Sequence, residues 1–122
     1  FVLVFWFDME VRMCLVGAGG IGAKSALVVR YLQGTFVERY DPTIEDSYRT
    51  NFLDKERGEE YVLEIMDTCG QEEYSQLRFQ YMRISEAFLV GYSITTATSF
   101  EAAEKLIAQI CYAKGFGAND VR

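Results

Sequence analysis

The chain has 122 residues, half of them hydrophobic, which is enough for one sizeable core and indicates one domain or part of one. Its 18 acidic and 12 basic residues leave a net charge of −6, so we expect no general affinity for nucleic acid or for an anionic membrane surface. Three cysteines and no histidine provide neither a zinc-ligand spacing nor a paired disulfide framework. This cysteine usage suits a reducing, cytoplasmic compartment.

The first seven residues, Phe1–Phe7, are strongly apolar. They are far fewer than the roughly 20 residues that span a bilayer, and no basic segment precedes them as in a signal peptide. We therefore interpret residues 1–8 as a non-native or disordered apolar extension, and residues 9–122 as the domain.

Residues 11–16 are apolar and predict a strand, followed by a glycine-rich loop at 17–22 and a helix over 24–33 that Gly34 is placed to end. Residues 47–54 alternate in polarity, with Tyr48, Thr50 and Phe52 on one face. A polar turn over 55–60 joins them to a strand at 61–66. This pattern predicts an antiparallel hairpin.

Residues 87–94 are nearly all apolar and predict a strand that is covered on both faces. Thr98 and Glu101 have the spacing of a capping box at the start of a helix. Apolar residues then recur at helical spacing at Phe100, Ala103, Leu106, Ile107 and Ile110. The whole pattern predicts an α/β fold with four strands.

The glycine-rich segment Gly17-Ala18-Gly19-Gly20-Ile21-Gly22-Ala23-Lys24-Ser25 lies between the first predicted strand and helix. A phosphate-binding loop needs glycines because its backbone N–H groups close around the phosphates, and a following lysine reaches the β and γ oxygens. The usual pattern is Gly-x-x-x-x-Gly-Lys-Ser, so Ala23 is one residue too many. The loop either bulges at Ala23 or shifts its frame and places alanines where glycines are needed, and both alternatives predict weaker phosphate binding.

The same loop also fits the Gly-x-Gly-x-x-Gly pattern of Rossmann-type dinucleotide-binding proteins, with Glu38 spaced as a ribose-binding carboxylate. The loop alone does not decide between a dinucleotide and a nucleoside triphosphate. Two further motifs favour the triphosphate. Asp41-Pro42-Thr43-Ile44-Glu45-Asp46-Ser47-Tyr48 places Thr43 18 residues after Ser25, and Asp67-Thr68-Cys69-Gly70-Gln71 follows later.

With these motifs in this order, residues 9–122 resemble the Ras and Rap small GTPases. The resemblance implies a P-loop NTPase-type α/β sheet flanked by helices, mostly parallel with one antiparallel hairpin at its edge. The chain stops at Arg122, before the last two strands of that fold and before the family's Asn-Lys-x-Asp motif, which reads the guanine ring. The domain is therefore expected to be partial.

The resemblance implies a GTP/GDP switch that hydrolyses GTP with Mg²⁺. It assigns nucleotide binding to Gly17, Ala18, Gly19, Gly20, Ile21, Gly22, Lys24, Ser25, Ala26, Phe36, Thr43 and Gly70. It assigns Mg²⁺ to Ser25, Thr43 and Asp67, and catalysis to Gln71, which orients the attacking water, and to Lys24. The effector-binding edge would comprise Tyr40, Asp41, Pro42, Thr43, Ile44, Glu45, Asp46, Ser47 and Tyr48.

Effector proteins, a GTPase-activating protein and an exchange factor are the partners that the resemblance implies. Membrane attachment would require a lipid anchor beyond Arg122. Cys69 stands where the family usually has alanine, next to the γ-phosphate, so we expect slower hydrolysis. A non-catalytic protein that keeps the effector edge but has lost nucleotide binding remains an alternative.

Overall fold

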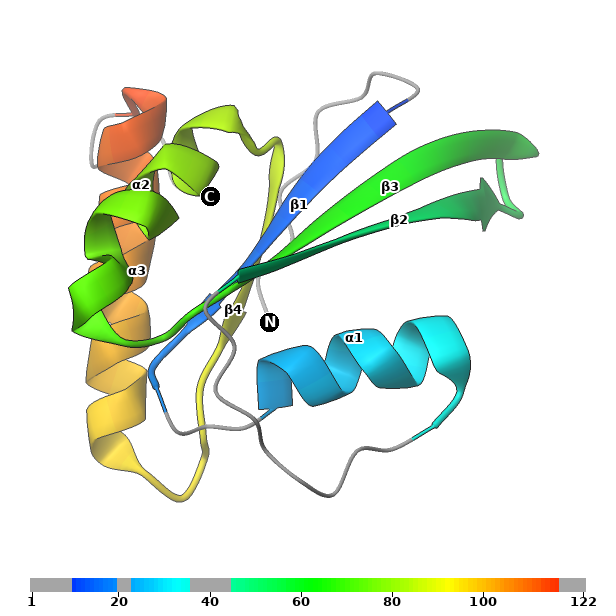
Figure 1. The fold of residues 1–122 in the computed structure, drawn as a ribbon. Helices are drawn as coiled ribbons and strands as arrows, with labels where there is room; N and C mark the ends of the chain where they lie inside the picture. Colours follow the sequence, from blue (N-terminus) through cyan, green and yellow to red (C-terminus); the bar gives the residue numbers. More distant parts are fainter. Residues whose placement is uncertain (1–9, 20–22, 36–44, 117–122) are drawn as a thin grey trace.

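The computed structural model describes residues 10–19, 23–35 and 45–116, which form a four-stranded sheet with helices on both faces (Figure 1). The elements follow one another as β1 (Glu10–Gly17), α1 (Ala23–Gln33), β2 (Glu45–Asp54), β3 (Glu59–Thr68), the 3₁₀ helix η1 (Glu72–Tyr74), α2 (Ser75–Ile84), β4 (Ala87–Gly91) and α3 (Ala97–Lys114). The strand order is β2-β3-β1-β4. β1 pairs in parallel with β3 and β4, and β2 pairs antiparallel with β3, which confirms the predicted sheet and hairpin. The predicted extension at residues 1–8 lies outside the described residues.

The turn between β2 and β3 explains why the hairpin closes at Asp54. Its Oδ1 accepts a hydrogen bond from the N–H of Glu56 at 2.9 Å, and its carbonyl accepts one from Gly58 at 2.8 Å. Gly58 has φ 68°, a conformation that glycine adopts without steric cost. As the alternation predicts, Tyr48 and Phe52 lie on the same face of β2, toward α1.

The core has two parts, one on each face of β1, because successive side chains of a strand point to opposite faces. Figure 1 shows α2 and α3 on one side of the sheet and α1 on the other. The α2/α3 side holds a buried cluster of Cys14, Val16, Met82, Phe88, Val90, Ala103, Leu106 and Ile110. The α1 side holds Leu15, Val28 and Ile65, with Met13, Leu32, Leu63 and Leu89 partly buried around them.

Helix ends follow local backbone rules. Gly34, with φ 71°, ends α1 as predicted, and its N–H donates to the Arg30 carbonyl at 3.0 Å. Gly115, with φ 72°, ends α3 in the same left-handed conformation. No helix in the described ranges is both long and apolar enough to cross a membrane.

Helix α2 and the 3₁₀ helix before it are missing from the predicted elements. The two buried residues of α2 are Arg78 and Met82, one helical turn apart. Because one of the two is charged, the buried face of α2 cannot be recognised from the polarity of residues 75–84.

The predicted strand over 87–94 is too long at its end. β4 stops at Gly91, and Ile94 is 92% exposed. The chain turns here toward α3, with the Thr96 N–H donating to the Ser93 carbonyl at 3.1 Å. Leu89, which points to the α1 side, is only half-buried, so that face of β4 is incompletely covered.

The predicted capping box of Thr98 and Glu101 is wrong. α3 begins at Ala97, and its N-cap residue Thr96 makes no side-chain capping hydrogen bond. The buried Ser99 stabilises this end instead. Its Oγ accepts a hydrogen bond from the Ser93 N–H at 2.9 Å and lies 2.7 Å from the Thr96 carbonyl, to which it donates. Phe100, predicted on the apolar face, is about half-exposed and packs edge-on against Tyr92.

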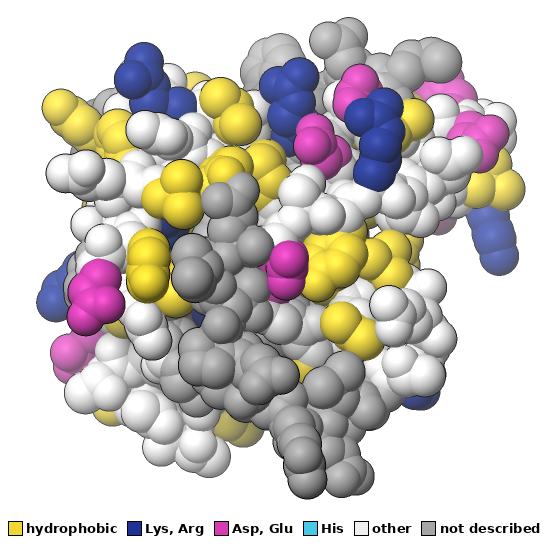
Figure 2. Space-filling model, viewed as in Figure 1, with side chains coloured by type: hydrophobic (Ala, Val, Ile, Leu, Met, Phe, Trp, Pro, Cys, Tyr) yellow, Lys and Arg dark blue, Asp and Glu magenta, His cyan; other side chains and the backbone are white. Residues whose placement is uncertain are grey.

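An apolar groove of about 520 Å³ lies between α1 and the sheet. Its lining includes Leu27, Tyr31 and Phe52, each about half-exposed, together with Val11 and Leu63. Figure 2 shows hydrophobic side chains on this face between the strands and α1. Among the described residues, α1 is the only helix on this side of the sheet, and it covers only part of it.

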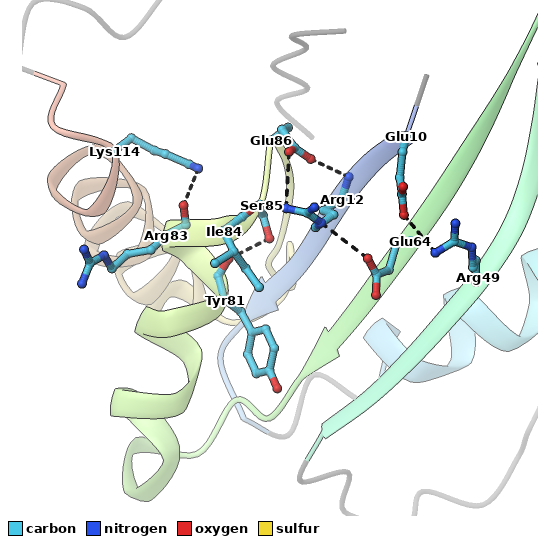
Figure 3. Close-up of polar contacts among 10 residues, drawn as sticks. All are labelled: Glu10, Arg12, Arg49, Glu64, Tyr81, Arg83, Ile84, Ser85, Glu86 and Lys114. Carbon is cyan, nitrogen blue, oxygen red and sulfur yellow. Dashed lines mark hydrogen bonds and ion pairs between the residues drawn. The ribbon is translucent and has the colours of Figure 1, made fainter. Parts of the chain in front are cut away.

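Charged residues gather around the amino end of β1, away from the loops that follow β1 and β3 (Figure 3). Arg12 on β1 lies 3.6 Å from Glu64 of β3 and 3.7 Å from Glu86, and its N–H donates to Glu86 at 2.7 Å. Arg49 of β2 pairs with Glu10 at 2.9 Å. These partly exposed pairs support the register of the sheet, each contributing about 0–1 kcal/mol.

Candidate functional site

The candidate site is at the carboxyl ends of β1 and β3. Asp67 lies opposite Leu15 in the parallel ladder, and its side chain is fully buried. The neighbouring Thr68 donates its hydroxyl hydrogen to the Leu15 carbonyl at 2.6 Å, which holds the two strand ends together. Because both strands point the same way, the loops that follow them leave from this one edge, where ligands of open α/β sheets bind.

Helix α1 brings two polar side chains to Asp67. The Ser25 hydroxyl donates a short hydrogen bond to Oδ2 of Asp67, and the Lys24 ammonium donates to the Gly17 carbonyl at 3.4 Å. Burial lowers the pKa of Lys24, and the charge of Asp67 opposes this effect. Burial raises the pKa of Asp67, while the hydrogen bond from Ser25 and the charge of Lys24 oppose that effect. For both the Lys24 ammonium and the Asp67 carboxylate, the surrounding charges and hydrogen bonds therefore do not fully offset the loss of solvation.

The second carboxylate oxygen of Asp67, Oδ1, is buried and accepts no hydrogen bond from the described residues. A buried carboxylate oxygen beside a serine hydroxyl is a suitable ligand pair for Mg²⁺, which prefers oxygen ligands. The described residues contain no group of three or more His, Cys, Asp or Glu side chains that could hold a metal. An ion here would need further oxygens from a phosphate or from water, as Mg²⁺ commonly does.

Gly70 rests directly on the glycine-rich loop. A Cβ atom built at Gly70 would lie 2.5 Å from the Gly19 nitrogen, 2.7 Å from the Ala18 carbonyl carbon and 2.7 Å from the Gly17 oxygen. These distances leave no room for any side chain, so glycine is required for the backbone contact. The loops after β1 and β3 therefore touch at the site. Gly20, Ile21 and Gly22 lie outside the described residues.

The turn that carries Gly70 and Gln71 is held by groups on both sides. The Gln71 N–H donates to the Cys69 sulfur at 3.4 Å, and the Gln71 side chain is exposed. Arg78 of α2 donates to the Cys69 carbonyl at 3.0 Å and to the Gln71 carbonyl at 3.2 Å. Sequence reasoning missed Arg78, because only its burial within an unpredicted helix distinguishes it from a surface arginine.

The strand order argues against the dinucleotide alternative. In Rossmann-type folds the strand after the first helix pairs in parallel beside the first strand. Here the strand after α1 is β2, which pairs antiparallel with β3, and the neighbours of β1 are β3 and β4. Glu38, the proposed ribose carboxylate, lies outside the described residues.

The comparison with known families agrees with this topology and with the contact between the loops that follow β1 and β3. The family model described as Ras family matches residues 12–121. The chain belongs to the Ras family. It is 49% identical over 109 residues to Ras-like protein 2 of Mucor circinelloides f. lusitanicus, an alignment that covers 88% of this chain and 53% of that protein. The chain thus spans about half the length of this curated relative.

In this Ras-family chain the extra residue Ala23 is the first residue of α1. Lys24 and Ser25 follow it on the helix and still reach Gly17 and Asp67 respectively. The insertion therefore does not separate the lysine from the serine in space. Its predicted effect on phosphate affinity stays a prediction. Ala26, the next residue on α1, is half-buried.

The described part of the expected effector edge is the start of β2, at the border of the sheet. Asp46 pairs in register with Asp67, so this strand begins beside the candidate site. Asp46 and Ser47 are exposed, and the Tyr48 hydroxyl donates to Asp46 at 3.5 Å. Burial, then the charge of Asp46, raises the pKa of Tyr48. Phe36 and residues Tyr40–Ile44, which include Thr43, lie outside the described residues.

Proposed function

We propose that this small GTPase of the Ras family binds GTP and GDP together with Mg²⁺ and hydrolyses GTP, acting as a molecular switch in signal transduction. The observation that carries the proposal is the convergence of Lys24, Ser25 and Asp67 at the ends of β1 and β3, against the Gly70 turn. A lysine and backbone N–H groups beside an unsatisfied carboxylate suit a phosphate ligand that arrives with a divalent cation.

Lys24 is the residue best placed to bind the β- and γ-phosphates. Its hydrogen bond to the Gly17 carbonyl is long, at 3.4 Å, so a phosphate oxygen can replace that carbonyl at little cost. Burial disfavours its charged form, and an anionic ligand would restore the pairing that the ammonium needs. Binding of phosphate is therefore expected to raise the pKa of Lys24.

Mg²⁺ would be held by the Ser25 hydroxyl and by Asp67, with Thr43 as a further ligand by resemblance. When bound, the ion would neutralise charge on the phosphate oxygens. The Gly70 N–H would donate to the γ-phosphate, and the exposed Gln71 side chain would orient the attacking water. Phe36 would pack against the guanine edge.

Effector binding is proposed for residues 40–48, of which Asp46 and Ser47 are exposed on β2. This strand starts beside Asp67, so an ion and nucleotide at the site would influence its shape. A GTPase-activating protein, an exchange factor and a cytoplasmic location belong to the same proposal.

One observation favours the alternative of a non-catalytic effector-binding protein. Ala23 lengthens the helix start ahead of Lys24, in a position where the phosphate-binding pattern has glycine directly before lysine. If that change prevents phosphate binding, the exposed start of β2 would remain as the functional surface.

Titration calorimetry with GTP, GDP and ATP, with Mg²⁺ and with EDTA, tests the proposal. We expect Mg²⁺-dependent binding. A GTP concentration 100 times the dissociation constant should also raise the free energy of unfolding by about 2.7 kcal/mol. Lys24→Ala should abolish binding, whereas Lys105→Ala, at an exposed position of α3, should not. Absence of triphosphate binding by the unchanged chain would overturn the proposal and leave the non-catalytic alternative.

A further inference from the structure

Arg78 is a buried cation that has no role in the function proposed above. It lies in the middle of α2, one turn before the fully buried Met82, and is 3% exposed. Burial of a guanidinium group is costly unless its hydrogen bonds are satisfied. Its position must therefore be explained by what it contacts.

A single nitrogen of Arg78, Nη1, donates to two carbonyls of one turn, those of Cys69 and Gln71, at 3.0 and 3.2 Å. Hydrogen bonds from a charged donor are roughly twice as strong as those between neutral groups. The two carbonyls flank Gly70, so one side chain restrains the backbone on both sides of that residue.

The first of these bonds also sets the direction of the Gly70 N–H. The Cys69 carbonyl and the Gly70 N–H belong to one planar, trans peptide unit, in which they point in opposite directions. Holding the carbonyl toward α2 therefore turns the N–H away from α2. On its other side Gly70 lies against the backbone of residues 17–19, so the turn is held between Arg78 and the glycine-rich loop.

We propose that Arg78 is a positioning residue that holds the Cys69–Gln71 turn so that the Gly70 N–H and the Gln71 side chain are presented to the phosphate site. The role in hydrolysis rests on the proposed function. The holding of the turn does not, because it can be measured without a nucleotide.

The first test uses the cysteines of the chain as reporters. Cys69 is 6% exposed and lies in the turn, and Cys14 is fully buried in β1 with its pKa raised to about 12 by burial. Alkylation by iodoacetamide, resolved by peptide mass spectrometry, gives a rate for each thiol. We expect Arg78→Met, which keeps side-chain length without donors, to accelerate Cys69 labelling roughly tenfold or more, with Cys14 unchanged.

The controls separate a local effect from a general one. Arg78→Lys keeps a charged donor and should show a smaller increase in Cys69 labelling than Arg78→Met. Arg83→Met changes an exposed arginine on the same helix and should leave Cys69 at its original rate. Equal Cys69 labelling with and without Arg78 would overturn the proposal. So would a parallel increase at Cys69 and Cys14, because it would mean that Arg78 supports only the global fold.

The second test measures the consequence for nucleotide chemistry. The Gly70 N–H is assigned to the third phosphate only, so Arg78→Met should slow single-turnover GTP hydrolysis roughly tenfold while GDP affinity changes by less than about threefold. Equal losses of GDP affinity and hydrolysis would contradict positioning. If the unchanged chain binds no nucleotide, the proposed function fails, and the thiol labelling still decides whether Arg78 holds the turn.

Discussion

Replacing Gly70 by alanine tests the contact between the two loops at the site. The added Cβ would lie 2.5 Å from the Gly19 nitrogen and 2.7 Å from two further backbone atoms of the glycine-rich loop. Overpacking of this kind costs about 1–3 kcal/mol. Because all three atoms belong to the backbone, no side chain can rotate away, and we expect a value near 3 kcal/mol. Neither Gly70 nor Gly19 has a positive φ, so steric overlap alone distinguishes the two positions.

Gly19→Ala is the matched control, since it places the same methyl group on the other side of the same contact. Its Cβ would lie 3.5 Å from the nearest atoms of Gly70, an ordinary van der Waals distance. We expect its free energy of unfolding to stay within about 0.5 kcal/mol of the original. Urea unfolding of the nucleotide-free chain measures both values, and Gly70→Ala should also lower the melting temperature by about 10 °C. Equal free energies of unfolding for the two variants would refute the close contact.

Three further predictions concern the helix start, the buried carboxylate and the insertion. Ser99→Ala should lower the free energy of unfolding by about 1–2 kcal/mol, because the Ser93 N–H loses its acceptor. Thr98→Ala should change the free energy of unfolding by less than about 0.5 kcal/mol. A larger loss for Thr98→Ala than for Ser99→Ala in urea unfolding would instead support the predicted capping box. Asp67→Asn should raise the melting temperature of the nucleotide-free chain near neutral pH, because burial raises the pKa of Asp67 and makes its charged form unfavourable. That gain should disappear as the pH falls below the raised pKa, where Asp67 is protonated, and a gain that persists in acid would argue against this cause. In a chain extended by a Ras-like C-terminal segment, deleting Ala23 should strengthen Mg²⁺-GTP binding at least tenfold, or about 1.4 kcal/mol, in titration calorimetry. Equal affinities would mean that the loop accommodates the insertion.

The local sequence was sufficient to predict the structure wherever a backbone rule acts within a few residues. Alternation placed Tyr48 and Phe52 on one face of β2, and Gly34 ended α1 because a left-handed residue is needed there. The spacing of the motifs also identified the family correctly, since Lys24-Ser25 and Asp67 must follow their strands in that order. The same local reasoning failed at the start of α3, where Thr98 has the pattern of a cap but Ser99 makes the bonds.

Only the tertiary structure decided which groups meet. Gly70 and Gly19 are far apart in the chain, and their contact arises because β1 and β3 are parallel neighbours whose following loops leave the same edge. The buried face of α2 includes the charged Arg78, and its burial could not be derived from apolar periodicity. Sequence patterns record what each segment prefers by itself, whereas burial and hydrogen bonding at this site depend on segments brought together by the strand order.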